Sequence, residues 1–280
     1  MKVLVTGADG YLGKGIVKQL LDDGNEVIAT GFNINAVDKR AKRIAIDLFT
    51  VKDPYSFFDQ PDVLLHLAWR DGFVHNSLAH LTDLPKHYEF LKKMVDSKIK
   101  MISVMGSMHE IGFYEGSINE DTPCDPMNLY GISKNALRET LSMLTKDTQT
   151  KMQWLRGYYI VDNNRKGSSI FSKIAEADYE GKEKFPFTMG QNQYDFLSYN
   201  KFCMYVSKAV EQSKITGIIN ICSGFPEKLA TVVEEYIKEN GFKVKLVYGA
   251  FPDRPYDSKA IWGNNRKLEE IIKNAEKKNA

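Results

Sequence analysis

A tyrosine and a lysine four residues apart form a pair that could move a proton. Tyr130 and Lys134 lie in a segment with helical spacing. Positions i and i+4 share one face of a helix, so the two side chains would be neighbours. A phenol, whose ordinary pKa is about 10, is a poor acid–base catalyst at neutral pH, and a nearby ammonium lowers that pKa. The pair could exchange a proton with an alcohol oxygen. Taken alone, the spacing also fits an ordinary exposed Tyr/Lys pair.

A hydroxyl group upstream could serve the same reaction. Ser107 follows the strand that we predict over residues 100–105. It would lie at the sheet edge where ligands bind in open α/β folds. There it could polarise the oxygen that Tyr130 protonates.

Three glycines near the N-terminus are spaced to hold a phosphate. Gly7, Gly10 and Gly13 directly follow an apolar strand-like run and precede a helical pattern. Glycines at such a turn let the backbone approach a pyrophosphate, which the N–H groups of the helix start then bind. A tight turn without a ligand is the alternative.

Strand-like and helix-like segments alternate along the chain, which indicates a parallel sheet covered on both faces. The fold class we predict is α/β, a Rossmann-like doubly wound parallel sheet with a smaller C-terminal α/β substrate-binding region. The larger domain would span residues 1–165 and the smaller region 166–280, with about 195–222 returning to the large sheet. Pro85 should mark an early turn or break in a helix over 77–96, 181–193 should be a loop, and the polar tail from Lys273 should fray.

Composition narrows the function. The 280 residues carry 38 basic and 36 acidic side chains, which gives no reason to expect nucleic acid or a membrane surface as a partner. The three cysteines are far apart and suggest reduced thiols in the cytoplasm. Five histidines show no metal-ligand spacing, so we expect no metal, and His75 and His80 look like surface residues. No apolar run approaches the ~18 residues that a membrane helix needs.

Together these motifs resemble the extended short-chain dehydrogenase/reductases, and within them the nucleotide-sugar epimerase, dehydratase and 4-ketoreductase group. The resemblance covers nearly the whole chain. It is carried by residues 6–13, 65–68, Ser107, 123–134, 184–196 and the arginine of 254–257.

The resemblance implies roles for particular residues. Tyr130 would be the acid/base, Lys134 would lower its pKa and hold the nicotinamide ribose, and Ser107 would polarise the substrate oxygen. Besides Tyr130 and Lys134, the implied cofactor-binding residues are Gly7, Asp9, Gly10, Tyr11, Leu12, Gly13, Gly31, Asn33, Arg40, Asp47, Leu48, Leu67, Ala68, Trp69 and Tyr158. The implied substrate-binding residues are Met108, His109, Ser169, Phe187 and Arg254. Arg156 matches a family arginine for which we expect a structural role.

One departure from the family concerns the reaction. The sugar 4,6-dehydratases carry Asp-Glu directly after the hydroxyl residue, and Met108 and His109 occupy those positions here. Neither can replace a carboxylate pair, which argues against a dehydratase. His109 should line the pocket as a hydrogen-bonding group, with proton donation as the alternative. Glu110 comes one position too late and is expected to point elsewhere.

A second departure concerns the cofactor. NAD-binding members carry an acid at the end of the second strand, which accepts the adenosine ribose 2′-hydroxyl. Residues 29–33 contain none, and Lys39, Arg40 and Arg43 follow. We therefore expect NADP(H). The alternative is NAD(H), with Asn33 on the ribose and the basic residues on a solvated surface.

The function predicted is an NAD(P)-dependent oxidoreductase on a nucleotide-activated sugar, reducing a 4-keto-deoxysugar with Tyr130 as general acid. A nucleotide-sugar 4-epimerase that retains NAD is one alternative, and a non-catalytic dinucleotide-sensing or scaffold module is another. Related enzymes often dimerise through the helices here expected over 77–96 and 128–144, so we also expect a homodimer.

Overall fold

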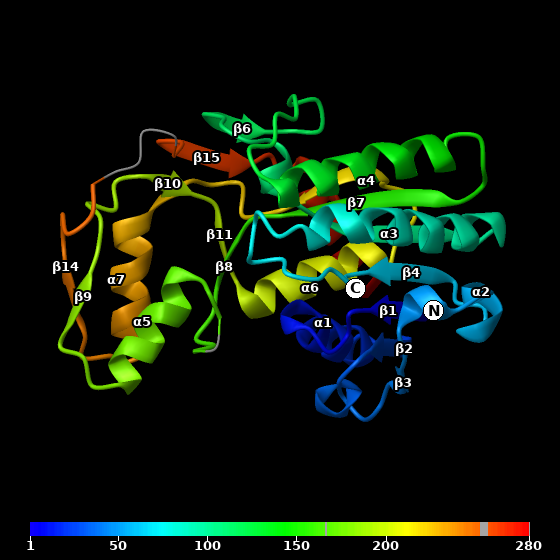
Figure 1. Cartoon of the computed structure of the whole chain (residues 1–280), viewed down its shortest axis with the longest axis horizontal. Coiled ribbons are helices and arrows are strands. Elements are labelled where there is room, and N and C mark those ends of the chain that lie inside the picture. The colour runs from blue at the N-terminus through cyan, green and yellow to red at the C-terminus, as the bar shows by residue number, and fades with distance from the viewer. Residues whose placement is uncertain (166, 253–256, 280) are drawn as a thin grey trace.

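A seven-stranded parallel sheet forms the centre of the larger part of the molecule (Figure 1). The computed structural model describes residues 1–165, 167–252 and 257–279. The strand order is β3-β2-β1-β4-β5-β7-β12. The bounds are β1 (Lys2–Thr6), β2 (Glu26–Gly31), β3 (Lys42–Ala45), β4 (Val63–His66), β5 (Met101–Ser107), β7 (Lys151–Gly157) and β12 (Gly217–Ile221).

Alternating side chains of these strands build two cores, one on each face of the sheet. Val3 and Val5 of β1 pack on one face with α1 (Tyr11–Asp22), α6 (Tyr199–Val210) and α8 (Arg266–Asn279). Leu4 packs on the other face with α3 (Ala79–Asp96) and α4 (Leu129–Thr145). Strands buried on both faces are typical of parallel sheets. The predicted α/β class is therefore confirmed.

A smaller part lies beside the strand ends and carries several short sheets (Figure 1). One sheet has the order β13-β10-β15-β6, and two further pairs are β11-β8 and β14-β9. The strands are β6 (Gly116–Ile118), β8 (Tyr159–Val161), β9 (Lys184–Pro186), β10 (Gln193–Tyr194), β11 (Phe196–Ser198), β13 (Glu227–Lys228), β14 (Lys245–Val247) and β15 (Ala260–Gly263). Helices α5 (Ile170–Tyr179) and α7 (Leu229–Glu239) enclose an aromatic core with them.

Short helices complete the chain, and three local predictions fail. The short elements are η1 (Ile34–Ala36), η2 (Leu48–Thr50), α2 (Pro54–Phe57) and η3 (Met108–Glu110). Residues 181–193 are not all loop, because β9 pairs with β14 there. Pro85 lies inside a continuous α3, whose buried face supplies packing that offsets the lost N–H bond. The expected frayed tail is instead the end of α8, which runs to Asn279.

Among the residues described, no helix is both long and apolar enough to cross a membrane. Within the same residues, no group of three or more His, Cys, Asp or Glu side chains is placed to hold a metal ion.

Candidate active site

The glycine loop between β1 and α1 has the shape of a pyrophosphate cradle. Gly7 has a φ of +64°, and a Cβ there would lie 2.7 Å from the Ala68 backbone. A Cβ on Gly13 would lie 2.3 Å from the carbonyl oxygen of Gly7. Helix α1 begins after Gly10 without a side-chain cap, so its first N–H groups remain available to an anion. These features fit a bound dinucleotide.

An acid does lie at the end of β2, although residues 29–33 supply none. The Asp9 carboxylate reaches across from the glycine loop and accepts hydrogen bonds from the backbone N–H groups of Phe32 (3.0 Å) and Asn33 (2.7 Å). A Cβ on Gly31 would lie 2.1 Å from Asp9 Oδ1, so the glycine makes room for the carboxylate. The position expected to lack negative charge therefore carries it.

Two of the three basic side chains expected near a 2′-phosphate, Arg40 and Arg43, have other partners. The Arg40 guanidinium pairs with Asp38 at 2.7 Å and with Asp22 at 2.8 Å. Arg43 donates to the backbone carbonyls of Asn35 and Val37, both at 3.4 Å. Arg40 thus already has two carboxylate partners, and its binding of the cofactor stays a prediction.

The other predicted cofactor residues are spread around the loop. Tyr11 packs its ring on Tyr199 at 4.9 Å, and Leu12 contacts the core beneath α1. Asp47 caps η2 through the N–H of Phe49. The remaining members are in or against the cores: Leu48, Leu67 and Tyr158. Leu48 and Tyr158 are each 8% exposed and Leu67 is partly buried, so little of these side chains is open to a ligand.

Ser107 ends β5 and is held by its own chain. Its N–H donates to Glu110 Oε1 at 2.6 Å, and its Oγ accepts from the His109 N–H at 3.2 Å. These two bonds form a capping box at the start of η3. The hydroxyl proton of Ser107 is then free to be donated, and Tyr130 is within hydrogen-bonding reach.

Tyr130 lies in the first turn of α4, where the backbone is anchored on both sides. Asn128 caps the helix by accepting from the N–H of Gly131, and the N–H of Tyr130 donates to the His75 carbonyl at 2.8 Å. Burial raises the pKa of Tyr130 to about 12, against a lowering by the hydrogen bond with Ser107. The side chain is therefore held as a phenol at neutral pH.

Lys134 is buried one turn further along α4. Its Nζ donates to the Met105 carbonyl at 2.8 Å and lies 3.9 Å from the centre of the Trp69 ring. The distance from Nζ to the Tyr130 ring centre is 5.9 Å. Burial lowers the pKa of Lys134 to about 7, while the Glu110 carboxylate raises it. The structure thus joins Lys134 to Trp69 more closely than to Tyr130.

All five histidines of the chain gather around these residues, which sequence spacing did not indicate. His75 stacks on Tyr130 at 5.8 Å and lies 4.5 Å from His109, measured between ring centres. His80 is 1% exposed and lies 5.4 Å from the Tyr130 ring. The expectation of surface residues is wrong for His80, and His75 is half-buried, because the loop before α3 folds over the start of α4. No signal within one element could have revealed this.

The two remaining histidines form a chain from β1 to α3. Thr6 Oγ1 lies 2.8 Å from His66 Nδ1, and His66 Nε2 lies 2.9 Å from His87 Nδ1. Thr6 Oγ1 also accepts from the Ala68 N–H. The chain can run in either direction, and in both directions each ring needs only one protonated nitrogen, so both rings can be neutral. Burial accordingly lowers the pKa of His87 to about 3 and that of His66 well below its ordinary value.

Trp69 is clamped between two of these rings. Its indole N–H donates to His80 Nδ1 at 3.0 Å, and its ring stacks on His87 at 4.6 Å. An indole N–H can only donate, so Nδ1 of His80 carries no proton and accepts this bond. The proton of the ring is on Nε2, which donates to the Val74 carbonyl at 3.0 Å. This clamp fixes the aromatic face that Lys134 touches.

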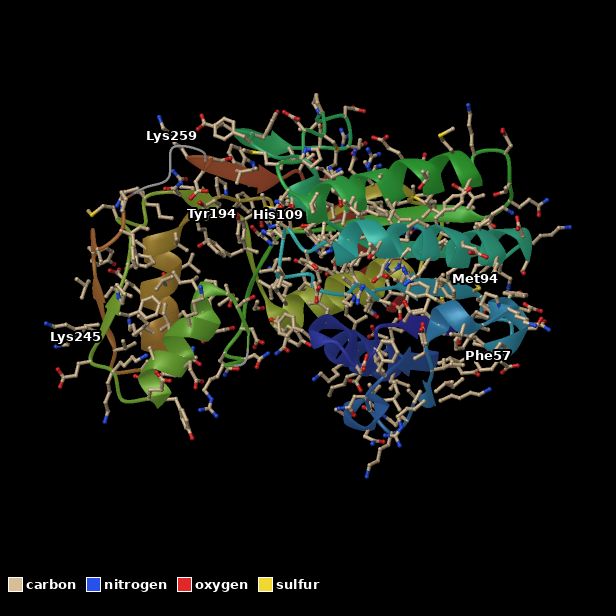
Figure 2. All side chains as sticks on the ribbon, viewed as in Figure 1. Phe57, Met94, His109, Tyr194, Lys245 and Lys259 are labelled. Atoms are coloured by element: carbon tan, nitrogen blue, oxygen red, sulfur yellow. The ribbon has the colours of Figure 1, made fainter. Side chains whose placement is uncertain are left out.

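The predicted substrate residues do not all meet. Met108 is buried and His109 lies close to Tyr130, at the border between the two parts of the molecule (Figure 2). Ser169 caps α5 by accepting from the N–H of Ser172. Phe187 is 1% exposed within the core of the smaller part, so its side chain cannot face a substrate. Arg254 lies outside the described residues.

Comparison with known proteins decides the family. The model of the NAD dependent epimerase/dehydratase family matches residues 3–222. This chain belongs to that family. It is 41% identical, over 94% of its length and 99% of the relative's, to the dTDP-6-deoxy-L-talose 4-dehydrogenase (NAD(+)) of Aggregatibacter actinomycetemcomitans. It is 27% identical, over 60% of this chain and 54% of the relative, to a UDP-glucose 4-epimerase of Lactobacillus helveticus.

Solved structures agree on the fold. A UDP-glucose 4-epimerase crystal structure matches with a TM-score of 0.84 at 17% identity, covering 96% of this chain and 91% of that one. The UDP-N-acetylglucosamine 4-epimerase of Methanobrevibacter ruminantium M1 matches with a TM-score of 0.83 at 19% identity, covering 96% and 91%. The resemblance to extended short-chain dehydrogenase/reductases is confirmed. The protein is a nicotinamide-dinucleotide-dependent oxidoreductase of this family, as predicted.

Proposed function

We propose that the protein interconverts the 4-keto and 4-hydroxyl forms of a dTDP-linked 6-deoxyhexose. The observation that carries this proposal is the 41% identity to a dTDP-6-deoxy-L-talose 4-dehydrogenase along almost the whole of both chains. The grouping of Ser107, Tyr130 and Lys134 at one sheet edge supports it. The substrate class is thus a nucleotide sugar in which C6 is a methyl group.

In this proposal a nicotinamide dinucleotide, when bound at the glycine loop, would supply or accept the hydride at the sugar C4. Tyr130, held as a phenol by burial, donates its proton to the sugar oxygen during ketone reduction. Ser107 donates its hydroxyl proton to the same oxygen and so stabilises the developing charge. Lys134 would hold the ribose of a bound cofactor and supply positive charge beside Tyr130. In the reverse direction the phenolate takes the proton back.

Among the described residues that follow Ser107, none provides the carboxylate pair that eliminates water from the sugar in the dehydratases. Met108 and His109 follow Ser107, and Glu110 turns away to the back of β5. Burial lowers the pKa of His109 to about 4, so the ring is neutral at pH 7 and suited to hydrogen bonding. A neutral imidazole at this position can form a hydrogen bond with a sugar hydroxyl.

For the cofactor we infer NAD(H) rather than NADP(H). The Asp9 carboxylate at the tip of β2 would repel a 2′-phosphate, and Arg40 is already paired with two acids. The name of the relative from Aggregatibacter actinomycetemcomitans specifies NAD(+).

The test is turnover of dTDP-6-deoxy-L-talose with NAD⁺, and of the dTDP-4-keto-6-deoxyhexose with NADH, by the purified protein. We expect coenzyme to be consumed one for one with sugar, and NADPH to support less turnover than NADH. Sugar inversion at C4 without added coenzyme would identify a 4-epimerase and overturn the proposal. Faster turnover with NADPH would overturn the cofactor assignment alone.

We further infer that residues 1–165 form the dinucleotide-binding domain and 166–280 the substrate region, with 195–222 returning to the large domain. The pairing of β12 with β7 supports the return. The three free cysteines support a reducing, cytoplasmic location.

A homodimer through α3 and α4 is the assembly we propose. These helices lie side by side on one face of the sheet (Figure 1). They expose large apolar side chains, among them Leu81 (42%), Ile132 (42%) and Met143 (78%). Light scattering after size exclusion should give twice the chain mass, and Ile132→Glu should reduce it to one chain. A wild-type monomer would contradict the proposal.

A further inference from the structure

Glu110 lies directly behind the candidate catalytic serine and is fully buried. One carboxylate oxygen accepts from the Ser107 N–H at 2.6 Å, and both accept from the indole N–H of Trp154 at 2.9 Å. The second oxygen also accepts hydrogen bonds from Nε and Nη2 of Arg156, each at 3.4 Å. Every neighbour is a donor, so the group is a carboxylate rather than a neutral acid.

The sequence makes room for this arrangement in the middle of the sheet. A Cβ on Gly106 would lie 2.1 Å from the Trp154 indole nitrogen. Glycine at this position therefore lets the indole cross β5 and reach Glu110. Both Glu110 and Arg156 are 0% exposed. An ion pair removed from water in this way is expensive, so a merely structural role would be served as well by apolar side chains.

The same carboxylate acts on Lys134. Lys134 donates to the carbonyl of Met105, two residues before Ser107 on β5. The titratable groups that interact with Lys134 besides Glu110 are His66 of β4 and His87 of α3, and both are held neutral. Glu110 is the only acid among these described neighbours, and it favours the ammonium form of Lys134.

The charge of Glu110 also acts on groups other than Lys134. Arg156 of β7 is its cationic partner, and the hydroxyls of Tyr130 and Tyr158 lie close enough for its charge to disfavour their ionisation. Removing the charge would therefore lower the pKa of Lys134 and of Tyr130 together. The two changes have the same sign and cannot cancel.

We propose that Glu110 is a positioning residue for the reaction: its carboxylate fixes the Ser107 backbone so that the hydroxyl faces Tyr130, and its charge favours the ammonium form of Lys134, which is bonded to the same strand. This inference rests on the proposed function for its kinetic part only. The sequence predicted that Glu110 points elsewhere. In this proposal Glu110 acts on the site from behind the sheet edge.

Two variants separate the hydrogen bond between Glu110 and the Ser107 N–H from the negative charge of Glu110. Glu110→Gln keeps an acceptor oxygen for the Ser107 N–H and removes the charge. Glu110→Asp keeps the charge beside Arg156 and is too short for the Ser107 N–H. Asp62→Asn is the control, because Asp62 accepts from the Lys2 N–H at 2.9 Å at the opposite end of the same sheet.

The first measurement needs no sugar. Titration of the lysine ¹³Cε resonances, with the Lys134 signal assigned through Lys134→Arg, reports the pKa of Lys134 in the free protein. Glu110→Gln should lower this pKa by about one unit. Glu110→Asp and Asp62→Asn should leave it in place. An unchanged pKa in Glu110→Gln overturns the role of the charge, whether or not the proposed sugar is a substrate.

The second measurement is the pH profile of kcat/KM for ketone reduction. The alkaline limb should move to lower pH in Glu110→Gln by the shift seen in the titration. In Glu110→Asp the limb should stay and kcat should fall about tenfold, with the KM for NADH unchanged. Full kcat in Glu110→Asp overturns the positioning of Ser107. Glu110→Asp retains the ion pair and tests this part even if Glu110→Gln does not fold.

Discussion

The Tyr130 hydroxyl decides whether the assigned chemistry is right. Tyr130→Phe should lower kcat about a hundredfold to ten-thousandfold, because the proton donor is lost. Binding of NADH should change little, since the phenyl ring still packs on His75. Stopped-flow or steady-state rates at saturating NADH measure the effect. Tyr55→Phe on α2 is the matched control, and loss of activity there, or full activity in Tyr130→Phe, would contradict the assignment.

Asp9 is the residue that we expect to select the cofactor. Asp9→Asn removes one negative charge beside the position of a 2′-phosphate while keeping an acceptor for the N–H groups of Phe32 and Asn33. The ratio of the dissociation constants for NADPH and NADH should fall about tenfold, measured by coenzyme fluorescence titration. Asp53→Asn is the control, since Asp53 accepts a backbone N–H at the start of α2. A constant ratio in Asp9→Asn would leave Asp9 without this role.

The glycine loop and α1 act together as one element. Gly13→Ala places a methyl group where the Gly7 carbonyl now lies, so α1 must move away from β1. We expect the dissociation constant for NADH to rise at least about tenfold, because the N–H groups at the start of α1 would no longer point at the pyrophosphate. Calorimetric titration measures this. Gly72→Ala, which meets no atom within 4 Å, should bind NADH as the wild type does.

Two consecutive elements, the loop over 70–78 and helix α3, supply two of the aromatic rings around Tyr130, those of His75 and His80. His75 reaches Tyr130 from the loop, while His80 and His87 reach Trp69 from one face of α3. The spacing of seven residues between His80 and His87 places both on that face, two turns apart. Their common target, Trp69, comes from the end of β4.

For the whole molecule, the buried neutral histidines predict loss of stability in mild acid. Burial depresses the folded-state pKa of His87 to about 3 from an ordinary 6.5. The unfolded chain therefore binds protons first as the pH falls. Stability is complete above about pH 6.5 and declines towards pH 3. His87 alone should cost about 2 kcal/mol of unfolding free energy between pH 7 and pH 5.

Urea unfolding at pH 7 and pH 5 measures this dependence. His87→Asn keeps an acceptor for His66 Nε2 and cannot take up a proton. The decline between the two pH values should be smaller in this variant by about 2 kcal/mol. His75→Asn is the comparison, since His75 is only half-buried and should change the decline less. An equal decline in wild type and His87→Asn would show that His87 is not the group responsible.

What the sequence determined by itself is local or periodic. Alternating apolar segments set the layered α/β fold, the three glycines set the turn after β1, and the four-residue spacing put Tyr130 and Lys134 on one face of α4. Each of these features depends on contacts within one element or between an element and its immediate neighbour. Backbone geometry fixes such contacts whatever the rest of the chain does.

Only the tertiary structure decided which distant side chains share an environment. It brought five histidines from four segments together, turned Asp9 to the tip of β2, paired Arg40 with Asp22 and Asp38, and aimed Glu110 at the back of Ser107. These outcomes depend on how parallel strands align their ends and on which loops fold over that edge. The spacing of residues along the chain does not determine the distances between side chains of different elements. The charges near the site and the burial of its residues therefore could not be predicted from the sequence.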